Sequence, residues 1–219
     1  GGDGGGDGDG DGDGGGASVF LVGAGPGPLD LLTLRAKALI ESAEVLIYDD
    51  LVSPDIVDLC PPACERLYMG KRGGRAGSAQ QAEIDAALAE HARRGRRVVR
   101  LKGGCPSLFA RLSPELAALR DAGAALELVP GVSSALAAPL AAGVSLTQRG
   151  VAEGVVITSG HDLQAFRRQV QSSSRAAQTL VVLMGARKLP DIVGVLEEEG
   201  WGEAPMSVVR DVGGANGGE

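Results

Sequence analysis

The chain has 219 residues with a formal net charge of −7, and 44% of its residues are hydrophobic while only 3% are aromatic. This length and apolar content suffice for one large or two small domains with a core of Val, Leu, Ile and Ala. No apolar run approaches the roughly eighteen residues of a membrane span, so we expect no membrane partner.

The first sixteen residues are only glycine and aspartate. Such a segment has no apolar side chain to bury, which predicts a disordered tail over residues 1–17. Five of the 28 acidic residues lie there, so the folded part has 23 acidic against 21 basic residues and a net charge of −2. A nearly neutral folded part argues against a general nucleic-acid binder.

Apolar runs typical of strands alternate with helical patterns along the rest of the chain. The predicted strands are Ser18–Val22, Val45–Tyr48, Arg66–Met69, Arg97–Leu101, Ala125–Val129, Gly154–Thr158, Thr179–Leu183 and Met206–Val209. The predicted helices are Asp30–Ser42, Ser78–Arg93, Ser113–Ala122, Ser133–Ala142, Leu163–Gln171 and Leu189–Glu199. Four of them start at a favourable N-cap residue: Asp30, Ser78, Ser113 and Ser133.

This alternation predicts an α/β fold with mainly parallel sheets. The character of the chain changes near Pro130-Gly131, which divides it into two small α/β domains, residues 18–129 and 130–219. A ligand crevice between two such domains is the natural site of function.

The loop after the first strand carries three glycines, Gly23, Gly25 and Gly27. It is not the dinucleotide fingerprint, because Pro28 stands where the third glycine of that motif is required. Pro26 has no N–H group and a fixed φ angle. The loop therefore suits a ligand held by its shape and by backbone carbonyls.

Further clusters follow the later strands, where the carboxyl ends of a parallel sheet build ligand sites. They are Asp49, the basic Lys71-Arg72, the double glycine Gly103-Gly104, the hydroxyls Ser133-Ser134, His161 and Met184-Gly185. Each also has a structural explanation: a turn aspartate, a solvated basic loop, a strand-exit turn, a helix cap or a loop histidine. A hydrolase has little support, since Gly-x-Ser-x-Gly is absent.

The three cysteines are Cys60, Cys64 and Cys105. The Cys60–Cys64 spacing has no second ligand pair, so we expect no metal site. Free thiols indicate a reducing compartment, such as the cytoplasm or the plastid stroma.

Eight motifs occur in order between Val19 and Gly185: VGAGPG, YDDLVS, MGKR, VVRLKGG, VPGVSSALAAP, GVSLTQRG, ITSGH and TLVVLMG. Together they resemble the tetrapyrrole (corrin/porphyrin) methyltransferase family. The resemblance implies two α/β domains with S-adenosylmethionine between them, and usually a homodimer. It also implies methylation of C2 and C7 of uroporphyrinogen III, which gives precorrin-2 for sirohaem or cobalamin.

The resemblance also assigns roles to residues. Asp49 matches the proton acceptor of the family and Lys71 its proton donor. The positions that match contacts to S-adenosylmethionine are Pro26, Gly103, Gly104, Cys105, Leu108, Ser133, Ser134 and Met184. Because the substrate carries many carboxylates, further cations are expected to bind it: Arg72, Arg100, Lys102, Arg111 and Arg149.

The sequence departs from the family at several positions. Cys105 replaces an aspartate, and a thiol replaces a carboxylate as a charged acceptor only if its pKa is lowered. Asp50 replaces an arginine, and we expect the C-terminal domain to lack strands that complete its sheet. Two alternatives follow: an impaired member that binds S-adenosylmethionine or a partner without turnover, and a methylase of a later corrin intermediate.

Overall fold

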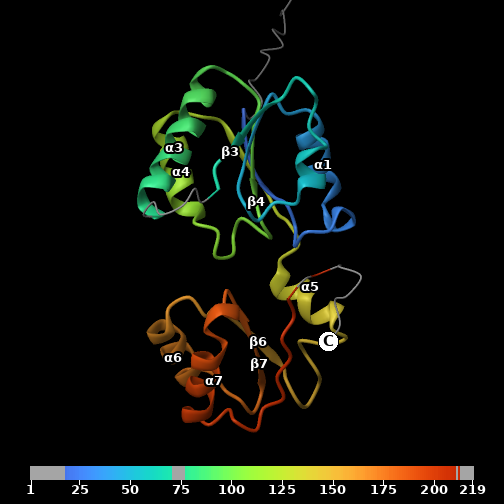
Figure 1. Cartoon of the computed structure of the whole chain (residues 1–219), viewed down its shortest axis with the longest axis vertical. Coiled ribbons are helices and arrows are strands. Elements are labelled where there is room, and N and C mark those ends of the chain that lie inside the picture. Colours follow the sequence, from blue (N-terminus) through green and yellow to red (C-terminus); the bar gives the residue numbers. More distant parts are fainter. Residues whose placement is uncertain (1–17, 71–76, 211, 213–219) are drawn as a thin grey trace, which may run out of the picture.

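The computed structural model describes residues 18–70, 77–210 and 212. The described elements form two lobes, and the chain passes from one to the other just after β5 (Figure 1). Each lobe contains one sheet, and every strand pair in both sheets is parallel. The predicted α/β fold with parallel sheets is therefore confirmed.

The first sheet has five strands in the order β3-β2-β4-β1-β5. Its strands are β1 (Val19–Gly23), β2 (Val45–Tyr48), β3 (Glu65–Tyr68), β4 (Val98–Lys102) and β5 (Leu126–Val129). Because all five run in the same direction, their carboxyl ends meet at one edge of the sheet.

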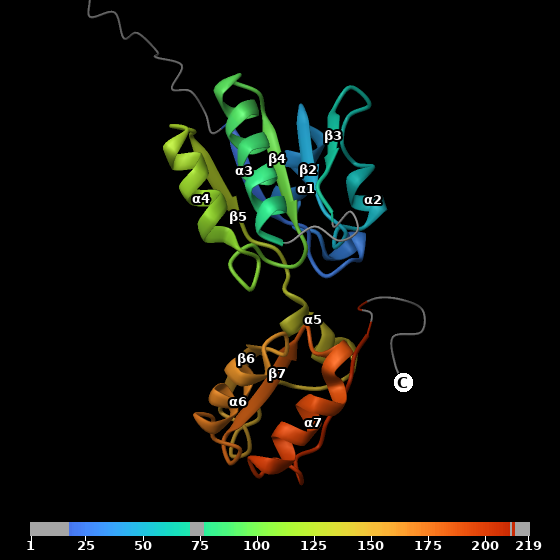
Figure 2. The same cartoon turned by 60° about the vertical axis from the view of Figure 1, so that its left-hand side comes forward.

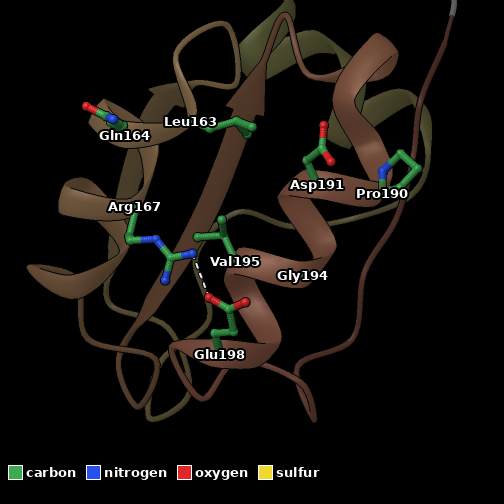
Figure 3. Close-up of a pocket in the computed structure, with 8 residues that line it drawn as sticks. All are labelled: Leu163, Gln164, Arg167, Pro190, Asp191, Gly194, Val195 and Glu198. Atoms are coloured by element: carbon green, nitrogen blue, oxygen red, sulfur yellow. Dashed lines mark hydrogen bonds and ion pairs between the residues drawn. The ribbon is translucent and has the colours of Figure 1, made fainter.

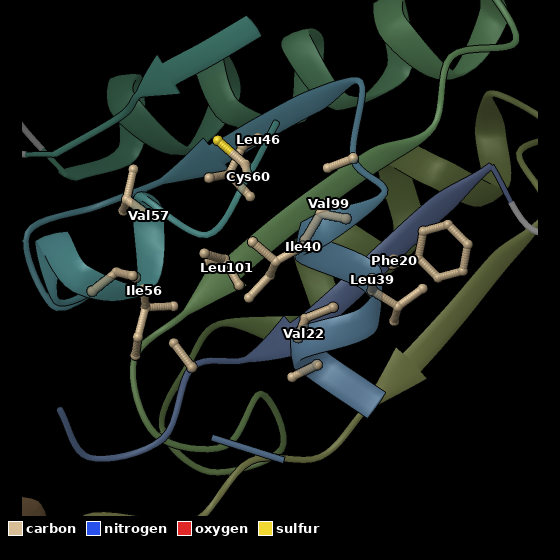
Figure 4. Packing of buried hydrophobic residues seen from close by; sticks show 14 of the residues in the cluster. Phe20, Val22, Leu39, Ile40, Leu46, Ile56, Val57, Cys60, Val99 and Leu101 are labelled. Atoms are coloured by element: carbon tan, nitrogen blue, oxygen red, sulfur yellow. The ribbon is translucent and has the colours of Figure 1, made fainter. Parts of the chain in front are cut away.

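Helices cover both faces of this sheet, with α1 (Leu34–Glu41) and α2 (Pro54–Val57) on one face and α3 (Gly77–Arg93) and α4 (Leu112–Asp121) on the other (Figure 2). Side chains of a strand point alternately to the two faces, so a doubly covered sheet needs an unbroken apolar strand. The α1/α2 face holds one apolar cluster (Figure 4), which includes Phe20, Val22, Leu46, Val99 and Leu101. The α3/α4 face holds another, which includes Val19, Leu21, Ile47, Leu88 and Leu119.

The second sheet has two strands, β6 (Gly154–Ser159) and β7 (Gln178–Leu183). Three helices accompany it: α5 (Ser134–Ala141), α6 (Leu163–Gln171) and α7 (Leu189–Glu198). Its core is a separate cluster of Phe166, Val170, Ile192, Val195 and Trp201. Short 3-10 turns occur at Leu29–Leu31 and Ala186–Lys188.

Seven of the eight predicted strands are confirmed with shifts of one residue at most, but the prediction for Met206–Val209 is wrong. That segment pairs with no strand in the described part of the chain, and Met206 and Val208 are exposed. An alternating apolar pattern makes a strand only where a neighbouring strand can accept its hydrogen bonds.

Helix starts were predicted less well than helix centres. The helix expected from Asp30 begins at Leu34, where the Thr33 hydroxyl accepts the Ala36 N–H at 3.1 Å, since the chain first makes the 3-10 turn. Ser78 and Ser113 lie inside α3 and α4 rather than capping them. Ser133 is confirmed as the N-cap of α5, and the short α2 was not predicted. The predicted tail over 1–17 lies outside the described residues.

Candidate functional site

Three glycines bring the loops after β1, β4 and β5 into backbone contact. A Cβ atom built on Gly23 would lie 2.5 Å from the Gly131 nitrogen and 2.6 Å from the Gly104 oxygen. One built on Gly131 would lie 2.3 Å from the Gly104 oxygen. No side chain fits at these distances, so glycine is needed here for the loops to meet.

The loops after β1 and β4 are also joined by hydrogen bonds. The Gly104 N–H donates to the Gly25 oxygen at 2.8 Å, and the Gly25 N–H donates to the Gly104 oxygen at 3.2 Å. Gly25 and Gly104 have φ angles of 73° and 69°, a region that favours glycine. Pro26 and Gly103, both predicted ligand contacts, are therefore brought to the same edge of the sheet.

Three residues other than glycine adopt left-handed backbone conformations within the described ranges. They are Phe109 (φ 51°), Arg111 (φ 49°) and Met184 (φ 56°). Two follow β4 and the third follows β7, so all lie in loops at carboxyl ends of strands. Unusual backbone of this kind concentrates at functional sites, which supports these loops as the ligand-binding region.

Asp49 follows β2 and lies on the α3/α4 side of the sheet, in phase with Val45 and Ile47. Its Oδ1 accepts the Leu51 N–H at 3.1 Å, and its Oδ2 accepts a hydrogen bond from Arg100 Nη2 at 2.9 Å. The side chain is 23% exposed. A carboxylate fixed at both oxygens and still open to solvent is well placed to take a proton from a ligand.

Arg100 and Lys102 project from β4 on the same side as Asp49, and both contact Glu115 of α4. Arg100 Nε lies 3.3 Å from Glu115 Oε1, and Lys102 Nζ lies 2.5 Å from Glu115 Oε2. Both basic side chains are 4% exposed, and burial lowers the pKa of Lys102 although the Coulombic attraction of Glu115 opposes this. Substrate contact by these two cations stays a prediction, but their charges are already paired within the chain.

Cys105, which stands at the family's aspartate position, is half-buried in the loop after β4. Its sulfur lies 3.1 Å from the Ser107 hydroxyl oxygen. Burial raises the pKa of this thiol, but hydrogen bonds from the Ser107 hydroxyl and from the backbone of Gly131 and Ser107 outweigh burial, so the pKa is lowered overall. The pKa of the Cys105 thiol is therefore shifted downward, as replacement of a carboxylate by a thiol requires.

The remaining predicted site residues lie in several places. The Ser133 hydroxyl accepts the Ala135 N–H at 3.2 Å, so capping of α5 already uses it. Leu108 is half-buried, Ser134 begins α5, and Met184 is 55% exposed at the end of β7. Arg111, Arg149 and His161 are exposed. Lys71 and Arg72 lie outside the described residues.

Glu115 was missed by the sequence reasoning, although the signal was present. It lies among Leu112, Leu116 and Leu119 on the apolar side of α4, and its side chain has 0% exposure. A carboxylate at a core position of a helix requires a buried cation, and the strand sequence VVRLKGG offers two.

A groove of about 460 Å³ lies in the second lobe between α6 and α7 (Figure 3). It is lined by Leu163, Gln164, Arg167, Pro190, Asp191, Gly194, Val195 and Glu198, and no predicted site residue is among them. Within the described ranges, no three His, Cys, Asp or Glu side chains are grouped to hold a metal ion, and no helix is long and apolar enough to cross a membrane.

Comparison with known proteins gives matches over almost the whole folded chain. The family model described as Tetrapyrrole (Corrin/Porphyrin) Methylases matches residues 18–217. A uroporphyrinogen-III C-methyltransferase of Synechococcus elongatus is 42% identical over 183 residues, which are 83% of this chain and 74% of the relative.

Solved structures agree with this match. Uroporphyrin-III C-methyl transferase of Thermus thermophilus, complexed with S-adenyl homocysteine, has a TM-score of 0.67 and 40% identity over 83% of this chain and 76% of that one. The cobalamin biosynthetic enzyme cobalt precorrin-4 methyltransferase has a TM-score of 0.72 but only 26% identity, over 84% and 76% of the two chains.

Proposed function

The chain belongs to the tetrapyrrole (corrin/porphyrin) methylase family, and from this premise we propose that it methylates C2 and C7 of uroporphyrinogen III to give precorrin-2. The methyl donor is S-adenosylmethionine, and the product serves sirohaem or cobalamin synthesis. The observation that carries the proposal is the Asp49 carboxylate, fixed by Leu51 N–H and Arg100 beside the converging glycine loops.

The glycine loops fit the donor, because glycine lets the backbone of the three loops pack closely and approach a ligand. Pro26, Gly103, Gly104, Cys105, Leu108, Ser133, Ser134 and Met184 would hold it. S-adenosylmethionine supplies a methyl group already activated as a sulfonium. The protein then has to orient the pyrrole carbon in line with that methyl group and to remove one proton after transfer.

Asp49 is the proton acceptor in this proposal. Its contact with the Arg100 guanidinium holds the carboxylate in place, and its partial exposure lets a ligand reach it. Lys71 is proposed as the proton donor. The substrate carboxylates would be bound by Arg111 and Arg149, which are exposed, and by Arg72.

We also propose that the protein acts as a homodimer. Leu136 and Leu140 of α5 are 55% and 76% exposed, and Val151 nearby in sequence is 60% exposed. Exposed apolar side chains of this size, two of them on one helix, favour a protein partner. Light scattering should give a dimer mass, and Leu140→Lys should shift it toward the monomer.

One observation favours a second candidate, a methylase of a later corrin intermediate: the TM-score is 0.72 with cobalt precorrin-4 methyltransferase and 0.67 with the uroporphyrin-III enzyme. Identity weighs against it, at 26% compared with 40% for the uroporphyrin-III enzyme. Substrate choice depends on individual side chains rather than on the shared backbone. Sequence identity therefore indicates the substrate better than the TM-score does.

The direct test is transfer of a labelled methyl group from S-adenosylmethionine to uroporphyrinogen III, with precorrin-2 identified by its absorption spectrum and mass. Asp49→Asn, which keeps the shape of the side chain, should lower the rate by about a hundredfold or more. If the unsubstituted protein transferred methyl groups no faster than Asp49→Asn, the proposal would be refuted. Tight binding of S-adenosylhomocysteine without transfer would instead identify an impaired family member.

A further inference from the structure

We infer that Glu115 is a positioning residue for methyl transfer: it holds the Arg100 guanidinium, and Arg100 in turn orients the Asp49 carboxylate. The inference rests on the proposed function, in which Asp49 accepts the proton. Glu115 itself is fully buried and has no access to a ligand. Its role is therefore exerted through Arg100.

The guanidinium of Arg100 has a separate acceptor for each of its nitrogens. Nη2 donates to Asp49 Oδ2 at 2.9 Å, Nη1 to the Leu101 oxygen at 2.7 Å, and Nε to Glu115 Oε1 at 3.3 Å. A planar guanidinium with three fixed acceptors has one orientation. Removal of the Glu115 acceptor frees the group to rotate, and Asp49 Oδ2 then loses its fixed donor.

The fold explains why these residues meet. Arg100 and Lys102 are two apart on β4, so both side chains reach the α3/α4 face, where Asp49 also lies at the end of the neighbouring strand β2. The helix on this face, α4, supplies Glu115 at a position otherwise suited to an apolar residue. The cluster thus connects a helix core position to the predicted catalytic group.

The charges of the cluster balance. Asp49 and Glu115 carry two negative charges, and Arg100 and Lys102 carry two positive charges. With the exception of Asp49, the side chains are at most 4% exposed. A buried cation that loses its partner is strongly unfavourable, so loss of Glu115 makes Arg100 and Lys102 compete for the remaining carboxylate, Asp49.

This competition predicts an effect on the chemical step rather than on binding. Glu115→Gln keeps the volume of the side chain but removes its negative charge and one of its two acceptor oxygens. We expect kcat to fall about tenfold to a hundredfold, because small displacements of reacting groups cost rate of this order. KM and the dissociation constant of S-adenosylhomocysteine should stay within about twofold. Glu115→Asp should restore part of the rate.

A double-mutant cycle separates positioning from a merely structural role. If Glu115 acts through Asp49, then Glu115→Gln should lower the residual rate of Asp49→Asn by less than about twofold, since the group it orients is already lost. A structural role would give the same fold-loss in both backgrounds, and that result would overturn the inference.

A second readout does not depend on activity. The urea unfolding midpoints of the same four proteins should be non-additive, because the two carboxylates share Arg100. The matched control is Glu127→Gln, which removes a carboxylate that also pairs with an arginine, Arg35, but at the surface. It should give additive midpoints with Asp49→Asn and an unchanged kcat.

The outcomes remain distinguishable from failure of the proposed function. Non-additive midpoints in a protein that transfers no methyl group would refute the proposed function and support the coupling of Glu115 to Asp49. Additive midpoints would overturn the inference whatever the activity. Where Glu115→Gln alone lowers the native circular dichroism, the cycle is repeated with Glu115→Gln/Lys102→Met, which removes one charge of each sign and keeps the cluster neutral.

Discussion

The two sheets of this protein bury their side chains to very different extents. Each of the five residues of β4 is buried, including Arg100 and Lys102, whereas each of the six residues of β7 is half-buried. The first sheet has five strands and helices on both faces, and the second has two strands in the described chain. A fully covered sheet can hold charged side chains in a fixed, mutually paired arrangement. A sheet with half-buried side chains offers mainly backbone shape, such as the left-handed turn at Met184.

The prediction with the largest expected effect tests how well the interior of the first lobe is shielded from solvent. Burial raises the pKa of Cys64 to about 12, aided by Cys60, whereas the pKa of Cys105 is lowered from its ordinary value. The reactive species is the thiolate, and its fraction falls tenfold per unit of pKa above the working pH. At pH 7 iodoacetamide should therefore label Cys105 about a thousandfold faster than Cys64, measured by peptide mass spectrometry.

Labelling at equal rates would show that the interior of the first lobe opens to solvent. Cys105→Ser provides the control, since it should abolish the fast labelling and leave the slow one unchanged. Added S-adenosylhomocysteine should protect Cys105 if the loop after β4 binds the donor.

The second prediction compares the sheets directly by the same substitution in each. Leu101 in β4 is 0% exposed, and Leu180 in β7 is half-buried. Leu101→Ala should lower the free energy of unfolding by about 3 kcal/mol, and Leu180→Ala by about 1 kcal/mol, because the loss scales with the apolar contacts removed and the cavity left. Urea denaturation followed by circular dichroism measures both, and equal losses would contradict the comparison.

The same contrast explains how far the sequence could predict the structure. Strands were well predicted because unbroken apolar runs such as VFLV and VLI leave few alternatives in a doubly covered sheet. Met206–Val209 failed because a strand also needs a partner, and pairing is a property of the whole fold. The start at Asp30 failed because a favourable N-cap residue also fits a turn, and Thr33 three residues later fits the cap equally well.

For the site, local sequence could identify the loops but not the pairing of charges. Gly23 and Gly104 were expected near a ligand, and the structure adds that they and Gly131 must contact one another. Arg100 was expected to bind the carboxylates of the substrate, whereas its partner Glu115, fifteen residues away on a helix, was not predicted. Which of several carboxylates a buried cation meets depends on how the helix packs, and this is not encoded in any local motif.

The third prediction compares a glycine at the carboxyl edge of the first sheet with a glycine in a helix of the second lobe. Gly131→Ala places a methyl group 2.3 Å from the Gly104 oxygen, so backbone must move, and we expect a loss of about 1 to 3 kcal/mol in the free energy of unfolding. Gly194 lies in α7 with nothing within 4 Å of its added Cβ. Gly194→Ala should stabilise the protein by about 0.5 to 1 kcal/mol, because alanine is the better helix former.

Calorimetry with S-adenosylhomocysteine extends this prediction. Gly131→Ala should weaken binding, since the three loops no longer meet, and Gly194→Ala should leave it unchanged. The essential expected result is that Gly131→Ala lowers the free energy of unfolding and Gly194→Ala raises it. A Gly131→Ala variant as stable as the parent would show that the close contact among the loops is not required.

The smallest expected effect concerns how helices of the two lobes begin. In the second lobe the Asp162 carboxylate caps α6, and the backbone N–H of Ala165, followed by that of Gln164, lowers its pKa. A carboxyl whose pKa is lower in the folded than in the unfolded chain stabilises the fold above the ordinary aspartate pKa, and this contribution disappears as the pH falls through the folded value.

Asparagine is an equally good N-cap but carries no charge. Asp162→Asn should therefore lower the melting temperature by only about 1 to 3 °C at pH 7, and the difference should vanish once the pH falls below the lowered pKa of Asp162. In the first lobe the uncharged Thr33 hydroxyl caps α1, so Thr33→Ser should show no such dependence on pH. A difference for Asp162→Asn that persists at low pH would mean that shape, and not charge, stabilises the start of α6.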